Sequence, residues 1–146
     1  MLKKEFQINN NDLVKSNFYL FYGLNEGAKN EKISKLLSGV KKENIQNYDE
    51  KQILDNKDNF YQTILSKSLF EEIKTIKVNR VTDKSLEIIN EILEKNITDI
   101  IIIFNASILE KKSKIRSLFE KHRELICVPF YEDTIEVLSS LSKAFL

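Results

Sequence analysis

Short apolar stretches recur along this chain, and segments with a helical pattern separate them. The five stretches are FYLFYG (18–23), NIQNY (44–48), IKTIKV (73–78), DIIIIF (99–104) and LICVPFY (125–131). Continuous runs of β-branched and aromatic residues are typical of strands that are buried on both faces of a parallel sheet. We therefore expect a mainly parallel, five-stranded sheet.

Apolar residues at helical spacing predict four helices between these stretches. The segments are 26–37, 59–69, 82–95 and 111–123. Their inward faces would consist, in chain order, of Ile33, Leu36 and Leu37; Phe60, Ile64, Leu65 and Leu69; Leu86, Ile89, Ile92 and Leu93; and Ile115, Leu118 and Phe119. Thr82 or Asp83 can cap the start of the third helix. Repeated alternation of strand and helix predicts an α/β fold with right-handed crossovers.

The last segment, DTIEVLSSLSKAFL (133–146), has the same helical pattern. It begins with a capping residue, Asp133, and it stops without a glycine or polar residue that would end a helix. We therefore expect one α/β domain in residues 1–132 and the start of a following, truncated helical region in residues 133–146.

Composition indicates a globular domain with little net charge. The chain has 146 residues, of which 42% are apolar, and 23 Lys and Arg nearly balance 22 Asp and Glu. A formal net charge of +1 excludes a strongly basic nucleic-acid module, although not a local basic patch. No apolar run approaches the length of a membrane span, and the first residues lack the apolar core of a signal peptide. We expect a cytoplasmic protein without a membrane partner.

Cysteine and histidine are too few for metal or disulfide chemistry. One cysteine, Cys127, excludes an internal disulfide, and one histidine adds little to a set of metal ligands. We expect no metal site. Cys127 lies in an apolar stretch and is interpreted as a small core residue.

The stretch FYLFYGLNEGAK resembles the start of a nucleotide-binding P-loop but departs from its pattern. A working P-loop reads G-x-x-x-x-G-K-[ST], and its main-chain amides, lysine and hydroxyl hold the phosphates and Mg²⁺. Gly23 and Gly27 enclose three residues rather than four, and Ala28 separates Gly27 from Lys29. Asn30 stands where the hydroxyl is needed.

The rest of the nucleotide machinery is also missing. Glu26 adds negative charge where phosphates would lie. An ATPase strand ends in a carboxylate that holds Mg²⁺, whereas two strands here are followed by Asn79-Arg80 and by Asn105. We interpret Asn105 as a turn residue, and the loop as a degenerate P-loop that does not bind nucleotide. A divergent P-loop NTPase is the alternative. A receiver-like signalling domain ranks last, because it needs clustered acidic residues at the strand ends.

Ser68-Leu69-Phe70 stands at the expected end of the second helix, just before a strand. Leu69 and Phe70 are adjacent, so a regular helix cannot point both into one core. Two interpretations stay open at this point. The pair is either an exposed anchor for a partner's hydrophobic pocket or part of the packing under the sheet edge.

Four stretches, in order, resemble the δ subunit of bacterial DNA polymerase III, a part of the clamp loader. They are FYLFYGLNE, SLFEEIKTIKVNRV, DIIIIFNASILEKKSKIRSLFEKH and VPFYEDTIEVL, and together they span most of residues 18–138. The resemblance implies a three-layer P-loop NTPase-like (AAA+, RecA-like) domain with helices on both faces of the sheet. It implies no catalytic site and no cofactor, within a holoenzyme that is a DNA-directed DNA polymerase (a nucleotidyltransferase).

The resemblance also implies a role in DNA replication. The subunit would bind the sliding clamp (the beta subunit) and open the ring, so that it can be loaded on primed DNA. Leu69 and Phe70, with Ser68, would enter a pocket on the clamp, other loader subunits would bind ATP, and C-terminal collar domains would follow. Motifs that bind the clamp often carry a glutamine a few residues before the aromatic, whereas Leu65 stands there in this chain and Gln62 lies one turn earlier.

A basic segment, KKSK (111–114), precedes more cations at Lys121 and Arg123. Because the loader of this family encircles primed DNA, Lys111, Lys112 and Lys114 are candidate contacts to phosphates. A solvated helix face is the alternative for these lysines.

Overall fold

Five parallel strands form the centre of the molecule. The computed structural model describes residues 18–65, 74–95, 97, 100–122 and 124–130. The strands are β1 (Phe18–Tyr22), β2 (Ile45–Asp49), β3 (Lys74–Asn79), β4 (Ile100–Asn105) and β5 (Leu125–Pro129). They pair in the order β2-β3-β4-β1-β5, and each pair is parallel. The expected parallel, five-stranded α/β sheet is therefore confirmed.

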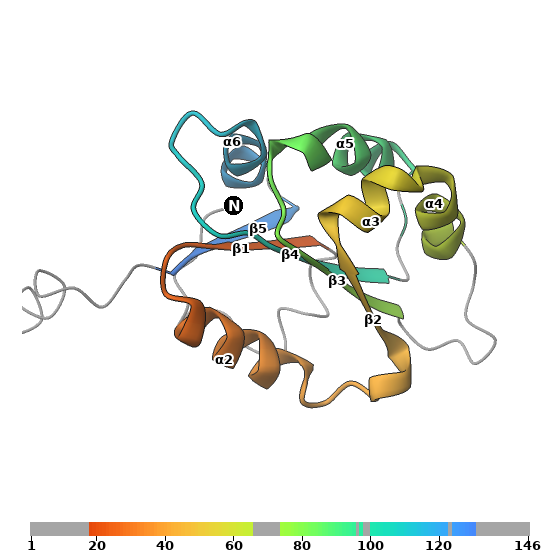
Figure 1. Ribbon diagram of the computed structural model, residues 1–146, viewed down its shortest axis with the longest axis horizontal. Helices are drawn as coiled ribbons and strands as arrows, with labels where there is room; N and C mark the ends of the chain where they lie inside the picture. The colour runs from red at the N-terminus through yellow and green to blue at the C-terminus, as the bar shows by residue number, and fades with distance from the viewer. Residues whose placement is uncertain (1–17, 66–73, 96, 98–99, 123, 131–146) are drawn as a thin grey trace, which may run out of the picture.

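Helices cover both faces of this sheet (Figure 1). They are α2 (Glu26–Leu37), α3 (Glu50–Asp55), α4 (Lys57–Leu65), α5 (Leu86–Glu94) and α6 (Lys114–Lys121), with short 3-10 turns η2 (Lys42–Asn44) and η3 (Asp83–Ser85). Among these, α2 lies against one face, and α3, α4, α5 and α6 lie against the other. Two helical layers thus enclose the sheet in the described part of the chain.

The strand order excludes one of the alternatives raised by the sequence. Receiver domains have the order 2-1-3-4-5, in which β1 is next to β2 and β3. Here β1 lies between β4 and β5, and two strands separate it from β2. A receiver-like signalling domain is therefore wrong for this chain.

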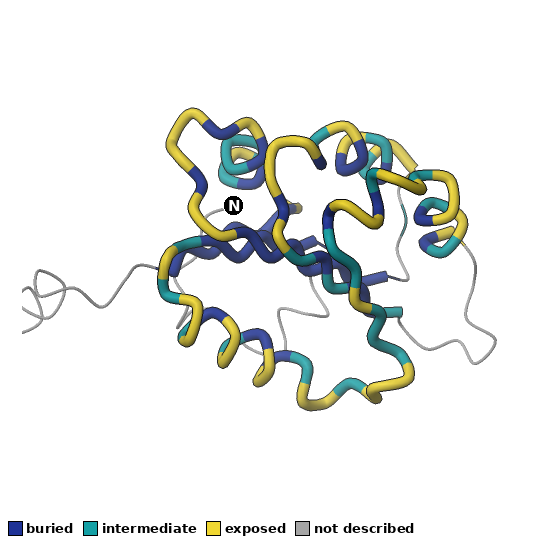
Figure 2. The backbone as a smooth tube through the Cα atoms, viewed as in Figure 1, coloured by how far each residue is buried: buried dark blue, intermediate teal, exposed yellow. Residues whose placement is uncertain are grey.

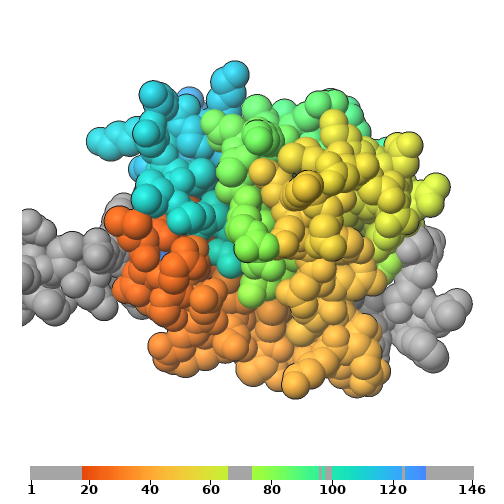
Figure 3. All heavy atoms as spheres, viewed as in Figure 1, coloured from red at the N-terminus to blue at the C-terminus, as the bar shows by residue number. Residues whose placement is uncertain are grey.

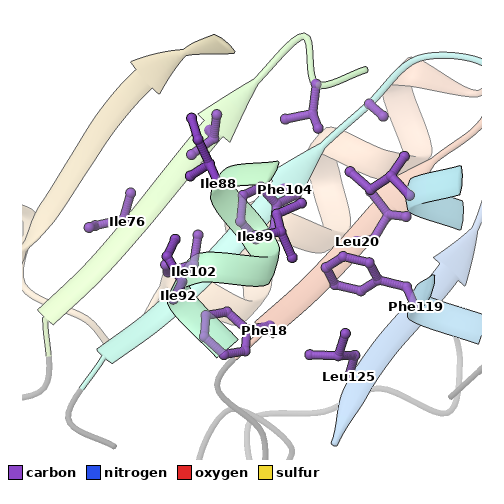
Figure 4. Packing of buried hydrophobic residues seen from close by; sticks show 14 of the residues in the cluster. Phe18, Leu20, Ile76, Ile88, Ile89, Ile92, Ile102, Phe104, Phe119 and Leu125 are labelled. Carbon is purple, nitrogen blue, oxygen red and sulfur yellow. The ribbon is translucent and has the colours of Figure 1, made fainter. Parts of the chain in front are cut away.

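The larger core lies between the sheet and the four helices of one face. Strand residues such as Leu20 and Ile102 meet Ile89 of α5 and Phe119 of α6, and Phe104 packs edge-on against Phe119 with ring centroids 5.9 Å apart (Figure 4). Every residue of β1, β4 and β5 is buried, as the tube in Figure 2 shows for the middle of the sheet. Continuous apolar runs in the sequence therefore correspond to the central strands.

The smaller core lies between the sheet and α2. Ile33 and Leu36 of α2 pack against Phe21, Ile103 and Val128. Leu37, which the spacing also placed on this face, is half-buried and packs at the margin of the same cluster.

The helix boundaries differ from the expected ones in the middle of the chain. Helix α3 was not foreseen, and α4 begins at Lys57, two residues before the predicted start. The expected inward position of Leu65 is wrong, because its side chain is 50% exposed. Leu65 follows buried Ile64 directly, and one residue turns a helix by about 100°, which moves Leu65 off the core face.

Two expected helices begin later than predicted. The segment expected at 82–95 opens with η3, whose cap is Thr82, and continues as α5. The segment expected at 111–123 forms α6 only from Lys114, because Ser113 caps that helix. The predicted inward residues Ile89, Ile92, Ile115 and Phe119 are buried, whereas Leu86, Leu93 and Leu118 are only partly buried.

Cys127 is fully buried in β5, as expected for a small core residue. Burial raises the pKa of its thiol to about 12, so it stays protonated and unreactive at neutral pH.

Candidate functional site

A polar cleft lies at the carboxyl edge of the sheet, where parallel α/β folds place their ligands. Its volume is about 340 Å³. Residues at or after the ends of β1, β2, β3 and β4 line it: Glu26, Lys29, Asn30, Asp49, Asn79, Arg80, Asn105, Ala106 and Ser107. Figure 3 shows α2 (orange), the turn after β3 (green) and the loop after β4 (cyan) meeting on the visible face. Of the degenerate P-loop predicted from the sequence, Lys29 lines this cleft and Gly23 and Gly27 do not; Glu26 and Asn30 line it as well.

Gly23 ends β1 because no other residue fits there. Its φ is +127°, and a Cβ atom would lie 1.9 Å from the carbonyl oxygen of Phe130. The amide of Gly23 donates to the carbonyl oxygen of Ser107, and the amide of Phe130 donates to that of Tyr22. The glycine is therefore required by a close approach of three chain segments. Packing alone accounts for it.

Gly27 has no comparable constraint. It lies in the first turn of α2, and its Cβ atom would meet only the side-chain oxygen of Asn25, at 3.8 Å. The two glycines that make this loop resemble a P-loop therefore have different roles, and only Gly23 is required by the fold.

The start of α2 bonds to its own loop. Asn25 caps the helix, and its side-chain oxygen accepts from the amide of Ala28 at 3.0 Å. The amide of Asn25 donates to the carbonyl oxygen of Phe130, and the amide of Glu26 donates to that of Leu24. Amides at a helix start are the donors that bind phosphate in a P-loop. Three of them are engaged within the chain here.

Lys29 extends from α2 toward the end of β4, where it is almost fully buried. Its side chain is 1% exposed, and Nζ donates to the carbonyl oxygen of Ala106 at 2.6 Å and to Glu26 Oε1 at 2.8 Å. A buried ammonium group needs such partners, because its loss of hydration is otherwise costly. The amino group that would contact phosphates in a P-loop is thus bound by the chain itself.

The opposite wall of the cleft comes from β2 and β3. Asp49 caps α3 through a capping box with Gln52, and its carboxylate forms an ion pair with Arg80. Arg80 has a positive φ of 58°, which is uncommon for a residue other than glycine and marks the tight turn after β3. That turn is held by the amide of Val81, which donates to the carbonyl oxygen of Asn105.

Asn105 ends β4 at the floor of the cleft. Its amide nitrogen donates to Asn79 Oδ1 at 3.0 Å. Its own Oδ1 is buried and has no hydrogen-bond partner among the described residues. Asn105 is thus more than a turn residue, because it joins the ends of two neighbouring strands.

Two carboxylates behind the cleft hold the adjoining loops together. Glu50, at the start of α3, is buried and accepts from the amide and hydroxyl of Thr82 and from the hydroxyl of Ser85. Asp83, in η3, accepts from the hydroxyl of Ser113 and from the first amides of α6. The loops after β2, β3 and β4 are therefore linked in series.

Burial by itself would raise the pKa of Asp83. The hydrogen bonds from Ser113 and from the amides of Ile115 and Lys114, together with the Lys114 charge, outweigh it and hold the pKa below its ordinary value. Asp83 therefore stays ionised at neutral pH and keeps its bonds to α6.

The candidate DNA-facing lysines gather at the start of α6. Lys111 and Lys112 lie in an exposed turn, and Lys112 forms an ion pair with Glu110 at 3.4 Å. Lys114 is exposed in the first turn of the helix. The three lysines follow Ser107, which lines the polar cleft, by a few residues in the chain. None of the three lysines lines the cleft itself.

The proposed clamp anchor, Ser68, Leu69 and Phe70, lies outside the described residues. The described part of α4 ends at Leu65, which is half exposed, and Gln62 is exposed as well. The assignment of the anchor thus stays a prediction from the sequence.

Sequence reasoning missed the partners that define this site. Nothing near Lys29 in the chain indicates a bond to Ala106, 77 residues away. The pairing of Asp49 with Arg80 and the bonds of Glu50 to Thr82 also join distant segments. Their positions in the chain gave the one available signal. All these residues follow predicted strands, and the carboxyl ends of parallel strands meet at one edge of the sheet.

Metal ligands and membrane-spanning segments are not found in the part of the chain that the structure covers. Those residues contain no group of three or more His, Cys, Asp or Glu side chains that could hold a metal ion. None of their helices is long and apolar enough to cross a membrane.

The fold has a counterpart among solved structures. A comparison with known families finds no family model that matches, and no curated protein matches by sequence. Among solved structures, the chain is similar to the DNA clamp loader delta protein of Bacillus subtilis, with a TM-score of 0.69 and 12% sequence identity. The match covers 94% of this chain and 45% of that protein. The likeness shows a shared fold over less than half the length of that protein.

Proposed function

We propose that this chain is a non-catalytic clamp-loader subunit of the δ type, which binds a sliding clamp and helps to open the ring. The ordered sequence resemblance and the fold shared with the Bacillus subtilis clamp loader delta protein support this proposal. The observation that carries its non-catalytic part is Lys29, whose amino group is bound by Ala106 and Glu26 rather than being open to a phosphate.

The finer fold assignment belongs to the same proposal. A parallel sheet in the order β2-β3-β4-β1-β5, with helices on both faces, fits a three-layer AAA+ domain of the P-loop NTPase type. In such a domain the polar cleft stands where nucleotide would bind. The engaged amides at the start of α2 argue that this cleft is a degenerate nucleotide site.

Clamp binding would rest on Leu69 and Phe70, with Ser68 beside them. Burying a leucine and a phenylalanine in a partner's pocket contributes roughly 1.5–3 kcal/mol each. Adjacent large apolar residues that enter one pocket are typical of the few side chains that dominate an interface. Together the pair contributes roughly 3–6 kcal/mol, whereas a micromolar affinity corresponds to about 8 kcal/mol, so further contacts would be needed beside it.

Ring opening would follow from differential binding. A subunit without catalysis can shift a closed ring toward an open one only if it binds the open ring more tightly. Other loader subunits would supply ATP-dependent control, and Lys111, Lys112 and Lys114 would contact the phosphates of primed DNA inside the assembly.

Surface plasmon resonance on an immobilised sliding clamp from the same organism tests this proposal. The chain should bind, and the Leu69→Ala/Phe70→Ala variant should bind roughly 100-fold more weakly or not at all. A matched control is Leu24→Ala/Ile108→Ala, which removes two exposed apolar side chains at the carboxyl edge of the sheet. Equal binding by the chain and the Leu69/Phe70 variant would sink the site assignment.

Nucleotide binding is the second candidate, because the polar cleft is large enough for part of a ligand and contains Lys29 and Arg80. A divergent P-loop NTPase would use Gly23, Gly27 and Lys29. Isothermal calorimetry with Mg-ATP separates the two functions. We expect no heat of binding up to millimolar nucleotide, and saturable binding that is lost in Lys29→Met would favour the NTPase.

A further inference from the structure

A shallow, mostly apolar groove is lined by α6 and the start of α5. Figure 1 shows these two helices on the same face of the sheet. The groove has a volume of about 530 Å³, and it shares no residue with the polar cleft. The residues that line it are Leu86, Lys114, Ser117, Leu118, Lys121 and His122. It is therefore a second, separate surface feature of the described part of the chain.

The groove uses a second stripe of α6. Lys114, Ser117, Leu118 and Lys121 stand at positions i, i+3, i+4 and i+7, which bring side chains onto one face of a helix. The buried stripe is a different one and is formed by residues such as Phe119, which points into the core. Leu118, at position i+4 of the groove stripe, is half-buried. The helix thus presents an apolar centre with a lysine at each end.

The charged side chains that line the groove are both lysines. None of its lining residues is acidic, and Lys114 and Lys121 are both exposed. The carboxylate of Asp83, which does not line the groove, is ionised close to Lys114 and partly offsets its charge. The lining itself contains two cations and no acidic side chain.

We propose that this groove docks a short acidic amphipathic segment of a partner protein. Apolar side chains of the segment would cover Leu86 and Leu118, and its carboxylates would pair with Lys114 and Lys121. The two lysines are seven residues apart, so their backbones are separated by about 10 Å along the helix. A complementary segment therefore carries carboxylates about two helical turns apart, on either side of its apolar residues.

The apolar side chains of the groove, Leu86 and Leu118, favour binding of a protein segment over binding of nucleic acid. Phosphates would be attracted to the lysines, but a DNA backbone offers no apolar group that would cover Leu86 and Leu118. Covering apolar surface stabilises a complex only when the partner is apolar as well. This docking site is separate from Leu69 and Phe70 and does not depend on clamp binding. It shares Lys114 with the candidate phosphate contacts, so an acidic segment and DNA would compete for that lysine.

Fluorescence anisotropy with the full 146-residue chain tests the proposal. The probe is a labelled helical peptide of about 15 residues in which glutamates flank two leucines. We expect saturable binding that weakens about tenfold or more in Lys114→Glu/Lys121→Glu. Replacing the peptide's glutamates with glutamine, or its leucines with serine, should weaken binding to a similar degree.

A matched variant controls for net charge. Lys42→Glu/Lys51→Glu makes the same change in net charge at two exposed lysines outside the groove, and it should bind the peptide as the unchanged chain does. Equal loss in both variants would overturn the proposal, because the attraction would then be general. Binding of labelled duplex DNA that depends on Lys121, without binding of the peptide, would also overturn it and identify a phosphate contact instead.

Discussion

The carboxyl edge of the sheet has two halves whose internal hydrogen bonds depend on side chains of opposite charge. In the β1 half, a buried cation, Lys29, donates to a main-chain carbonyl. In the half formed by β2, β3 and β4, the carboxylates of Glu50 and Asp83 accept from amides and hydroxyls of neighbouring loops. The first half contains the loop whose sequence resembles a P-loop, and its polar groups are engaged internally. The second half acts as a brace that fixes three loops, and it requires no ligand to do so.

The largest loss of stability is expected from a substitution at Gly23, in the β1 half, where the backbone lies very close to that of Phe130. Gly23→Ala should lower the free energy of unfolding by roughly 3–5 kcal/mol, because it adds backbone strain at φ +127° and a clash with Phe130. Urea denaturation, followed by circular dichroism, measures the free energy of unfolding. A variant that fails to fold would agree with a loss of about 5 kcal/mol.

Gly27→Ala is the matched control for this substitution. Gly27 is helical and has open space at its Cβ position, so alanine should stabilise the protein by roughly 0.5–1 kcal/mol. Effects of the same sign and size at both glycines would mean that the loop is not held by the contact between Gly23 and Phe130.

The brace is expected to be the next most sensitive feature. Glu50→Gln keeps the size of the side chain but replaces one acceptor oxygen with a donor, which faces the donors Thr82 and Ser85. The free energy of unfolding should fall by about 2–3 kcal/mol, the cost of leaving buried polar groups unsatisfied. The exposed Glu43→Gln should change it by less than about 0.5 kcal/mol. A small effect at Glu50 would show that the loops are fixed by packing alone.

The fold was easier to predict than the site, because the apolar pattern of a strand is local in the sequence, whereas the contacts of the site join distant segments. Strands β1, β4 and β5 are continuous apolar runs, so a local window is enough to find them. Helix α3 was missed because its six residues, EKQILD, are too few to show a helical period. The boundaries of α6 depend on Ser113, whose side chain selects the first turn.

The site could be located from the sequence, but its chemistry could not be read from it. Gly23 and Lys29 were named as positions of a degenerate P-loop, and both lie at the carboxyl edge. Their roles depend on Phe130 and Ala106, which tertiary folding brings to them from distant segments. The exposed position of Leu65 shows the same limit at shorter range, because one residue of rotation separates a core position from a surface position.

Lys29 itself should have a moderate effect on stability. Lys29→Met keeps most of the apolar stem but leaves the carbonyl oxygen of Ala106 without its donor, which should cost about 1–2 kcal/mol in urea denaturation. The control is Lys35→Met on the same helix, where the lysine is exposed and pairs with Glu31 at 3.2 Å. That surface pair should be worth less than about 0.5 kcal/mol. Equal costs at Lys29 and Lys35 would contradict a structural role for the buried amino group.

The smallest effect is expected at Asp83, and it should depend on pH. Because its pKa is lower in the folded protein than in the unfolded chain, its contribution to stability is present above the unfolded value and is lost as pH falls through the folded one. Asp83→Ala should therefore cost about 1 kcal/mol at pH 7, a typical loss for a side chain that caps a helix start. The difference from the unchanged protein should shrink as the pH is lowered below 4. The exposed Asp55→Ala serves as the control, and a cost at Asp83 that stays constant from neutral to acidic pH would show that its charge has no part in holding α6.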